Sequence, residues 1–371
     1  MMKKAYDFAF IAIFFILCVY TCIHAPLFAP FVRQALDMCA QVLIPSLFPF
    51  LFLTQIFSRT GLAEAAGKTV SFILSPLFGI PKELCGAFLA GLAGGYPNGA
   101  TAAGIAYEKG RCSKQAAERV AALSDNASPA FLIGMAGAYS LGSPKAGFLL
   151  CAALLLTLVT NAAFLRLCYP LKKSVDPIKT SDKRVSFAAA FCQSVQNAVT
   201  NMLFICGYVI LFYMLSGVIC HVFLQNSNAL ARFGVQSFFE ISGAVMAVRN
   251  ADFPLNHILC AAAVGFSGLS VICQVTDISA KYGFSVRQFL FTRLTGTVLM
   301  PLYTALLLLV LPRQTISVCG YVRPLPVTST KALVGTVLLY AFFTLFAMCV
   351  LGLVYLISEI WERKHVKNLK T

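Results

Sequence analysis

Polar residues interrupt the long apolar runs of this chain at a few places, and chemistry is expected there. The first is the stretch 94–99, Gly-Gly-Tyr-Pro-Asn-Gly. Glycine lets a backbone approach a ligand closely, and the amide of Asn98 adds a hydrogen-bond donor and an acceptor. A tight turn that only packs helices is the alternative. The substrate-binding candidates in this stretch are Gly94, Gly95, Pro97, Asn98 and Gly99.

A second stretch of the same character lies at 265–270, with the sequence Gly-Phe-Ser-Gly-Leu-Ser. Its candidates for contact with a substrate are Ser267, Gly268 and Ser270. Hydroxyl groups both donate and accept hydrogen bonds, but they also satisfy neighbouring backbone groups. A binding role and a purely structural role are therefore equally open for the two serines.

A polar interruption marked by a proline follows the first stretch, Ser-Asp-Asn-Ala-Ser-Pro at 124–129. Ionisable residues inside apolar segments are costly and usually functional. Asp125 is therefore a candidate site for a coupling proton or sodium ion, although aspartate also suits a helix cap. Asn126 and Ser128 are predicted to line the substrate site.

The corresponding interruption after the second stretch, Thr-Arg-Leu-Thr-Gly-Thr at 292–297, contains a cation. A guanidinium group pairs with a carboxylate through two hydrogen bonds, so Arg293, with Thr295 beside it, predicts an acidic substrate. A snorkelling arginine at the membrane edge is the equally open alternative. Glu240 is a lone acid in an apolar context, and it either caps a helix or couples ions.

The composition places these residues in a membrane protein. Of the 371 residues, 59% are hydrophobic and 12% are charged, which excludes a soluble domain. The net charge of +15 is carried by short clusters between apolar runs, as in cytoplasmic loops, so nucleic acid is not an expected partner. The partners that we expect are the lipid bilayer and a small molecule.

No motif predicts an enzyme, a cofactor or a metal. The 14 cysteines are scattered and the 4 histidines lie far apart. A nucleotide-binding loop and a nucleophile elbow are both absent from the sequence. We therefore expect no catalytic residue, no metal ligand and no cofactor.

Apolar runs of about 20 residues predict seven membrane crossings. They lie at 8–24, 36–57, 118–140, 146–169, 199–223, 290–311 and 332–358. The glycine-broken segments 84–108 and 257–280 have arms that each cover only half a membrane, so both are predicted to be re-entrant hairpins. Short amphipathic pieces, 68–80 and 236–248, precede them and suit the membrane interface.

Each half of the chain is therefore predicted to contain, in order, a helix, an interfacial piece, a hairpin, a broken helix and a helix. This order predicts an all-α polytopic membrane protein with inverted repeats, and paired broken segments indicate a transporter site. The predicted parts are an N-terminal helix and linker (1–34), a first repeat (35–170), a basic cytoplasmic loop with an amphipathic segment (171–198), a second repeat (199–360) and a basic tail (361–371). Lys and Arg counts favour a cytoplasmic amino terminus and leave the side of the tail open.

Several of these motifs resemble those of the YlbJ-type sporulation integral membrane proteins. They are Gly95–Ala100, Gly110, Ala117–Arg119, Ser124–Gly134 and Phe239–Gly243, with Ser242 where the family shows threonine. The resemblance covers about residues 36–311 and is more specific in the first half. Asp125 stands where relatives are expected to have a neutral residue, which leaves the coupling ion open.

The resemblance implies a nucleoside-recognition gate domain and a fold similar to that of concentrative nucleoside transporters. It also implies uptake of dipicolinic acid across the outer forespore membrane of a spore-forming bacterium. We therefore expect a transporter of a small organic anion, with a proton or sodium ion as a possible coupling ion and a homo-oligomer as a possible assembly. The alternatives are transport of a nucleoside or other small metabolite, and a non-transporting assembly protein of the spore envelope.

Overall fold

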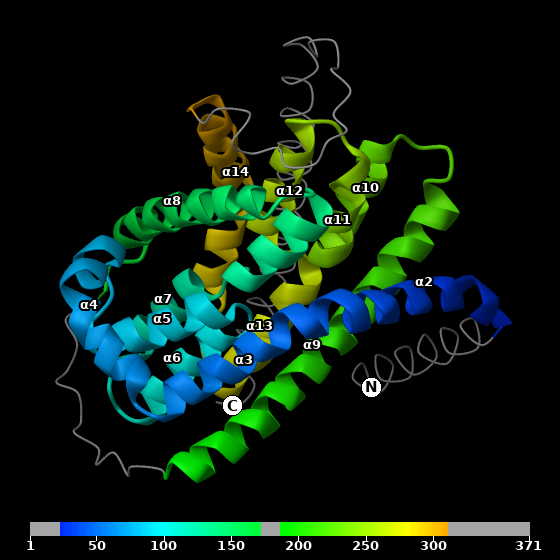
Figure 1. Ribbon diagram of the computed structural model, residues 1–371. Coiled ribbons are helices and arrows are strands. Elements are labelled where there is room, and N and C mark those ends of the chain that lie inside the picture. The colour runs from blue at the N-terminus through cyan, green and yellow to red at the C-terminus, as the bar shows by residue number, and fades with distance from the viewer. Residues whose placement is uncertain (1–22, 172–185, 311–371) are drawn as a thin grey trace, which may run out of the picture.

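The computed structural model describes residues 23–171 and 186–310, and within these ranges the protein is helical, without strands (Figure 1). Five helical segments are long and apolar enough to cross a membrane. They are Ala25–Arg59, Pro144–Cys168, Phe187–Phe223, Leu255–Lys281 and Arg287–Val310. The chain is therefore an integral membrane protein, as the composition predicts. The predicted crossings 8–24 and 332–358 lie outside the described residues.

The first crossing consists of α2 (Ala25–Met38), the π-helical η1 (Cys39–Leu43) and α3 (Ile44–Arg59). The long helix α9 (Phe187–Phe223) packs against both α2 and α3, and it crosses them diagonally in Figure 1. Helix α8 (Pro144–Cys168) lies on the opposite side of the core. The shorter helices of the chain contribute part of the site, and the crossings contribute the rest.

The shorter helices of the first half begin with α4 (Leu62–Phe78), η2 (Lys82–Leu84) and α5 (Cys85–Gly94). The chain bends by 114° between α4 and the η2–α5 segment. It then folds back at 84–108, as predicted, because α6 (Asn98–Glu108) packs against α5. A Cβ atom added to Gly91 would lie 2.7 Å from the Cα atom of Gly99, so this close approach requires glycine.

The predicted crossing 118–140 is interrupted and does not form one span. Helix α7 (Lys114–Ser124) ends at Asp125, and the π-helical η3 (Phe131–Ser140) follows. The interruption at 125–130 agrees with the polar, proline-marked sequence. We name residues 125–130 the first break.

The predicted second hairpin, 257–280, is wrong. Helices α12 (Leu255–Phe266) and α13 (Gly268–Lys281) follow one another as a single 27-residue span. The backbone at Ser267 and Gly268 is left-handed, with φ of 75° and 79°, and this interrupts the helix without reversing it. Two arms of half a membrane each make one crossing when they are joined end to end. We name Ser267 and Gly268 the second break.

The predicted interruption at 292–297 is also wrong, because α14 (Arg287–Val310) is continuous through it. The threonine hydroxyls donate to carbonyl oxygens of their own helix, at 2.7 Å from Thr292 to Phe289 and 2.8 Å from Thr297 to Arg293. Polar side chains satisfied in this way do not break a helix. Gly265 and Gly296 bring α12 and α14 together, since a Cβ at Gly265 would lie 2.3 Å from the Gly296 oxygen.

The remaining helices of the second half are α10 (Ala229–Phe239), α11 (Ile241–Ala247) and η4 (Val248–Asn250). The predicted interfacial piece 236–248 is therefore divided at Glu240, which separates α10 from α11. The other predicted piece, 68–80, lies largely within α4. The inverted relation of the two halves and the orientation in the membrane stay predictions.

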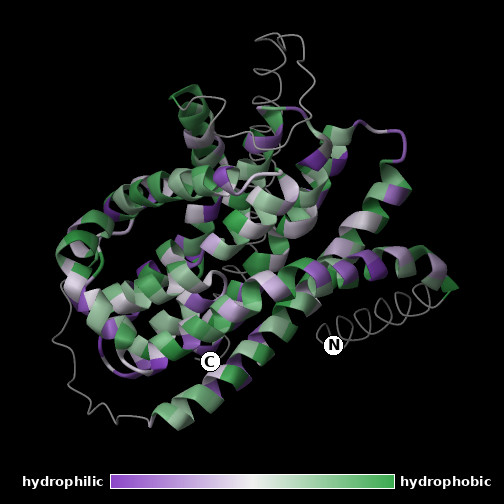
Figure 2. Cartoon of the chain, viewed as in Figure 1, coloured by the Kyte–Doolittle hydropathy of each residue, from purple (hydrophilic) through white to green (hydrophobic). Residues whose placement is uncertain are grey.

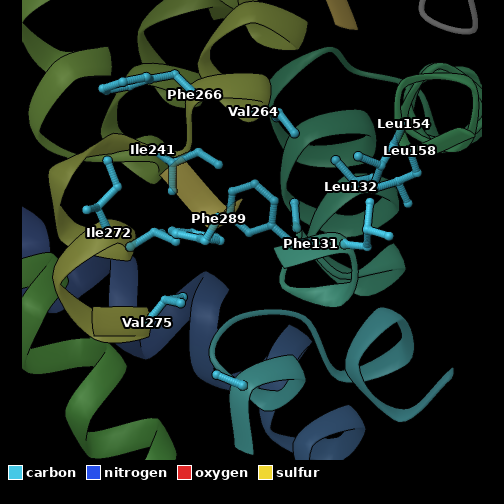
Figure 3. Close-up of a cluster of buried hydrophobic side chains, with 14 of the residues drawn as sticks. Phe131, Leu132, Leu154, Leu158, Ile241, Val264, Phe266, Ile272, Val275 and Phe289 are labelled. Atoms are coloured by element: carbon cyan, nitrogen blue, oxygen red, sulfur yellow. The ribbon is translucent and has the colours of Figure 1, made fainter. Parts of the chain in front are cut away.

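Apolar side chains occupy both the outer surface and the core. Figure 2 shows hydrophobic residues along α8 and α9, where Phe148, Leu203 and Phe204 are exposed as expected for lipid contact. In the core, Phe131 and Leu132 of η3 meet Val264 of α12, Ile272 of α13 and Phe289 of α14 in one cluster (Figure 3). This packing fixes the breaks of both halves against one another.

Candidate functional site

Arg293 of α14 brings together three of the predicted polar segments. Its side chain is 3% exposed. Its Nη1 donates to the Tyr96 hydroxyl at 3.0 Å and to the Ser267 Oγ at 3.2 Å. Its Nη2 donates to the Asn126 Oδ1 at 2.6 Å. The hairpin tip (Gly95–Pro97), the first break and the second break therefore meet at one guanidinium group.

The positive charge of Arg293 is only partly compensated. Its guanidinium carbon lies 5.1 Å from the ring centre of Phe289 and 5.8 Å from that of Tyr96, where aromatic faces attract cations. Asp125 interacts with it electrostatically, but no ion pair to Arg293 forms among the described residues. Its Nε is buried without a hydrogen-bond partner. Arg293 is therefore a buried cation that keeps one unused hydrogen-bond donor, at Nε.

Tyr96 contacts both this guanidinium and a cavity of about 50 Å³. Tyr96 is one of the residues that line the cavity, and its hydroxyl is hydrogen-bonded to Arg293 and to the Ser267 Oγ. Phe131 and Ile241, both labelled in Figure 3, line the same cavity. Tyr96 therefore connects the guanidinium group to the cavity wall.

The hairpin tip is held in place by the first break. Gly95 has φ of 72°, and a Cβ atom there would lie 2.8 Å from that of Ser128. The Tyr96 amide donates to the Asn126 carbonyl oxygen at 3.2 Å. Only glycine permits this approach and this backbone conformation, so the tip sequence determines where Tyr96 points.

Asp125 caps a helix of the hairpin and does not line the cavity. One carboxylate oxygen accepts from the Gly99 amide and the other from the Ala100 amide, both at 2.8 Å. These amides are free donors at the start of α6, and a buried carboxylate satisfies them. Asp125 is fully buried, with both oxygens occupied.

Glu240, by contrast, faces the cavity. Its Oε2 accepts from the Gly243 amide at 2.6 Å and so caps α11. Its Oε1 has no partner, although the residue is only 1% exposed. Glu240 also packs against the second break, because a Cβ atom added to Gly268 would lie 3.1 Å from the Glu240 nitrogen.

The other predicted residues lie at different distances from this centre. Gly94 and Ser128 line the cavity, and the Ser128 Oγ accepts from the Phe131 amide at 3.2 Å. Ser270 does not line the cavity, although the next residue, Val271, does. The Ser270 hydroxyl accepts a hydrogen bond from the Gln274 side chain at 3.2 Å. These positions make Ser128 accessible to a ligand and Ser270 a support.

Two predicted residues point elsewhere. The Asn98 Oδ1 accepts from Gln55 of α3 at 3.3 Å, outside the cavity wall. Thr295 donates to the Asn161 Oδ1 of α8 at 2.6 Å and therefore joins two crossings. A helix presents neighbouring residues in different directions, which is why Thr295 and Arg293 do not share the site.

Tyr96 and Gln274 are site residues that the sequence reasoning missed. Tyr96 stands inside the glycine-rich stretch, and its position between Gly95 and Pro97 is the signal that was available. Gln274 lies one helical turn after Ser270, a spacing that places both on one face. Within the two described ranges, no group of three or more His, Cys, Asp or Glu residues could hold a metal ion.

Comparison with known proteins confirms the resemblance suggested by the motifs. The chain is 24% identical over 311 residues to the sporulation integral membrane protein YlbJ of Bacillus subtilis. The match covers 74% of this chain and 76% of that protein. No family model matches the chain, and no solved structure matches it at a significant level. The protein is thus an integral membrane protein similar to YlbJ over most of the length of both chains.

Proposed function

We propose that this protein serves in sporulation and transports a small organic anion, dipicolinate, across the outer forespore membrane. The observation that carries the proposal is the buried Arg293, which joins the hairpin tip to both breaks beside a cavity. A guanidinium group binds a carboxylate through two parallel hydrogen bonds. The similarity to a sporulation protein supports the biological setting.

A second buried arginine illustrates what a purely structural guanidinium looks like. Arg119 of α7 donates to the carbonyl oxygens of Gly79, Leu165 and Tyr169. Two of these acceptors belong to the end of α8, where cations stabilise free carbonyl groups. Arg293 donates instead to side chains of the hairpin tip and of both breaks, and this difference supports a role in binding.

The cavity wall suits a flat aromatic acid. Tyr96 and Phe131 offer ring faces, and Ser128, Ser242 and Gln274 offer hydrogen-bonding groups. Aromatic rings stack favourably on one another in offset or edge-to-face arrangements. Dipicolinate combines a planar ring with two carboxylates, so it matches both the rings and the guanidinium.

The cavity is small in this conformation. A volume of about 50 Å³ holds a few water molecules and is well below the usual size of a ligand pocket. Substrate entry therefore requires a wider state, in which the hairpin tip moves relative to the second break. We assign the widening to the contact between Tyr96 and Ser267, because this contact links the two segments.

The test is uptake of labelled dipicolinate into vesicles that contain the purified protein, with nucleosides as competitors. Saturable uptake that is blocked only by dipicolinate-like acids is the expected result. Uptake blocked by nucleosides would favour the metabolite alternative. Silence toward both classes, in protein shown to be folded, would favour an assembly role and contradict transport.

Arg293→Lys gives the matched test of the site. Lysine keeps the charge but loses the planar pair of donors, so uptake is expected to fall about tenfold or more. The control is Lys145→Arg, the reverse exchange at an exposed position at the start of α8. Equal uptake by the two variants would remove Arg293 from the site.

A further inference from the structure

We propose that Glu240 is the proton-binding site that couples substrate movement to a proton gradient, an inference that rests on the proposed transport of an organic anion. Glu240 lines the same cavity as Tyr96, its Oε1 has no partner, and its side chain is 1% exposed. The anion site proposed at Arg293 and the two breaks gives this unpartnered acid on the cavity wall no role.

A negative charge on Glu240 is costly in this cavity. A carboxylate removed from water is unfavourable unless it is paired or fully hydrogen-bonded. Gly243 satisfies the Oε2 of Glu240 and Ser242 also interacts with the carboxylate, whereas no hydrogen bond reaches the Oε1. The cavity that Glu240 lines is otherwise mostly apolar, with side chains such as Leu51, Ile205 and Val271. No ion pair to Glu240 forms within the described ranges. The neutral, protonated acid is therefore the form that the empty cavity favours.

A bound anion strengthens this preference. Two negative charges repel strongly at short range where the dielectric constant is low. A dicarboxylate in the cavity would face Glu240, so it enters readily only when Glu240 carries a proton. The protonated Oε1 becomes a donor, and it then binds a carboxylate oxygen of the substrate.

The surroundings of Glu240 contain little else that titrates. Of the residues that line the cavity, only Tyr96 and Glu240 are titratable. The titratable side chains that interact with Glu240 electrostatically are Cys39 of η1 and Tyr213 of α9. Thiol and phenol groups are ordinarily neutral at neutral pH, and α13 contributes the uncharged Gln274. Glu240 is thus the group whose charge changes.

Release of the substrate then reverses the cycle. When the cavity opens to water on the other side, the solvated Glu240 loses its proton and the repelled anion leaves. One proton bound at Oε1 therefore crosses with each substrate anion, in the same direction. Asp125 does not serve this role, because both of its oxygens accept backbone amides.

The test uses full-length protein in sealed vesicles, with the membrane voltage clamped at zero. Labelled dipicolinate and a pH-sensitive dye are followed together, and the readout is the number of protons per dipicolinate. For the wild type, a gradient of one pH unit, acidic outside, is expected to drive about tenfold accumulation for each coupled proton. Glu240→Gln is expected to lose this accumulation while labelled dipicolinate still exchanges across the membrane. Glu83→Gln, an exposed acid of η2, is the control and should match the wild type.

Two results would overturn the proposal while leaving transport intact. One is wild-type exchange of dipicolinate with no proton movement and no response to the pH gradient. The other is an unchanged proton ratio in Glu240→Gln. If Glu240→Gln does not fold, Glu240→Asp is measured instead. It keeps a carboxyl group, so the proposal predicts that proton movement stays coupled to dipicolinate transport. Absence of any wild-type exchange would instead reject the proposed function and the coupling with it.

Discussion

Asp125 and Glu240 are both buried acids at helix interruptions, and both contact backbone amides, yet their environments differ. Asp125 uses one oxygen for Gly99 and the other for Ala100, and it stands outside the cavity wall. Glu240 uses one oxygen for Gly243, has no hydrogen bond to the other, and lines the cavity. The same residue class therefore satisfies backbone donors with both oxygens at the first break and keeps one oxygen unpaired between α10 and α11.

The difference teaches that burial alone does not mark a functional acid. A carboxylate whose oxygens are all satisfied is part of the scaffold, because its removal leaves donors unpaired. A carboxylate with a spare oxygen in a cavity costs stability and is retained for another reason. For the two buried arginines the kind of partner differs, not the number: each makes three hydrogen bonds and leaves its Nε unpaired, but Arg119 donates to backbone carbonyls and Arg293 to side chains.

The largest expected effect is a loss of stability in Asp125→Asn. An amide has one acceptor oxygen, so either the Gly99 or the Ala100 amide stays buried without a partner. We expect the free energy of unfolding to fall by about 3 kcal/mol, measured as a lower melting temperature in detergent. Asp277→Asn is the control, since Asp277 is exposed and forms only an i,i+4 pair with Lys281. If Asp125→Asn were as stable as the wild type, Asp125 would not be the structural cap that distinguishes it from Glu240.

Tyr96→Phe is expected to have the next largest effect. It removes the hydroxyl that is bonded to Arg293 and Ser267, which costs about 1.5 kcal/mol of stability. Because that hydroxyl also orients the guanidinium, dipicolinate uptake should fall severalfold. Tyr139→Phe, at an exposed ring of η3, serves as the control. Unchanged uptake in Tyr96→Phe would show that the Tyr96 hydroxyl of the hairpin tip has no role in transport.

Thr295→Val tests whether Thr295 lies outside the substrate site, as the structure indicates. The change removes the hydrogen bond to Asn161 and should cost about 1 kcal/mol of stability. Uptake by the folded variant should equal that of the wild type, since Thr295 does not line the cavity. Lost uptake at normal stability would extend the site toward α8.

Glu240→Gln is expected to change stability least, by less than about 1 kcal/mol. The amide oxygen still accepts from Gly243, and the variant no longer buries an ionisable group without a partner. Melting temperatures of Glu240→Gln and Asp125→Asn, measured side by side, sharpen the comparison. A loss as large as that of Asp125→Asn would make Glu240 a second structural cap.

The sequence predicted the membrane class, the first hairpin and the first break, because their signals are local. Apolar length identifies crossings, and the glycines at 94–99 with the proline at 129 identify a turn and an interruption. It also predicted that Asn126, Ser267 and Arg293 belong to one site, and the structure brings them together.

The features that the sequence did not predict depend on backbone angles and on contacts between distant residues. Whether the arms at 257–280 fold back or continue depends on two backbone angles, at Ser267 and Gly268, which the sequence does not specify. The break expected at 292–297 is absent because the threonine hydroxyls bond within the helix. Tyr96 was missed because an aromatic residue in a turn has no distinctive pattern until its partner, 197 positions away, is known.

The most direct test of the central claim is dipicolinate binding to purified protein, measured by titration calorimetry for the wild type and Arg293→Lys. Melting temperatures of both proteins establish that they are folded. The account predicts saturable binding by the wild type and at least about tenfold weaker binding by Arg293→Lys, because the paired hydrogen bonds of the guanidinium are lost. Equal affinities in two folded proteins would contradict an anion site centred on Arg293.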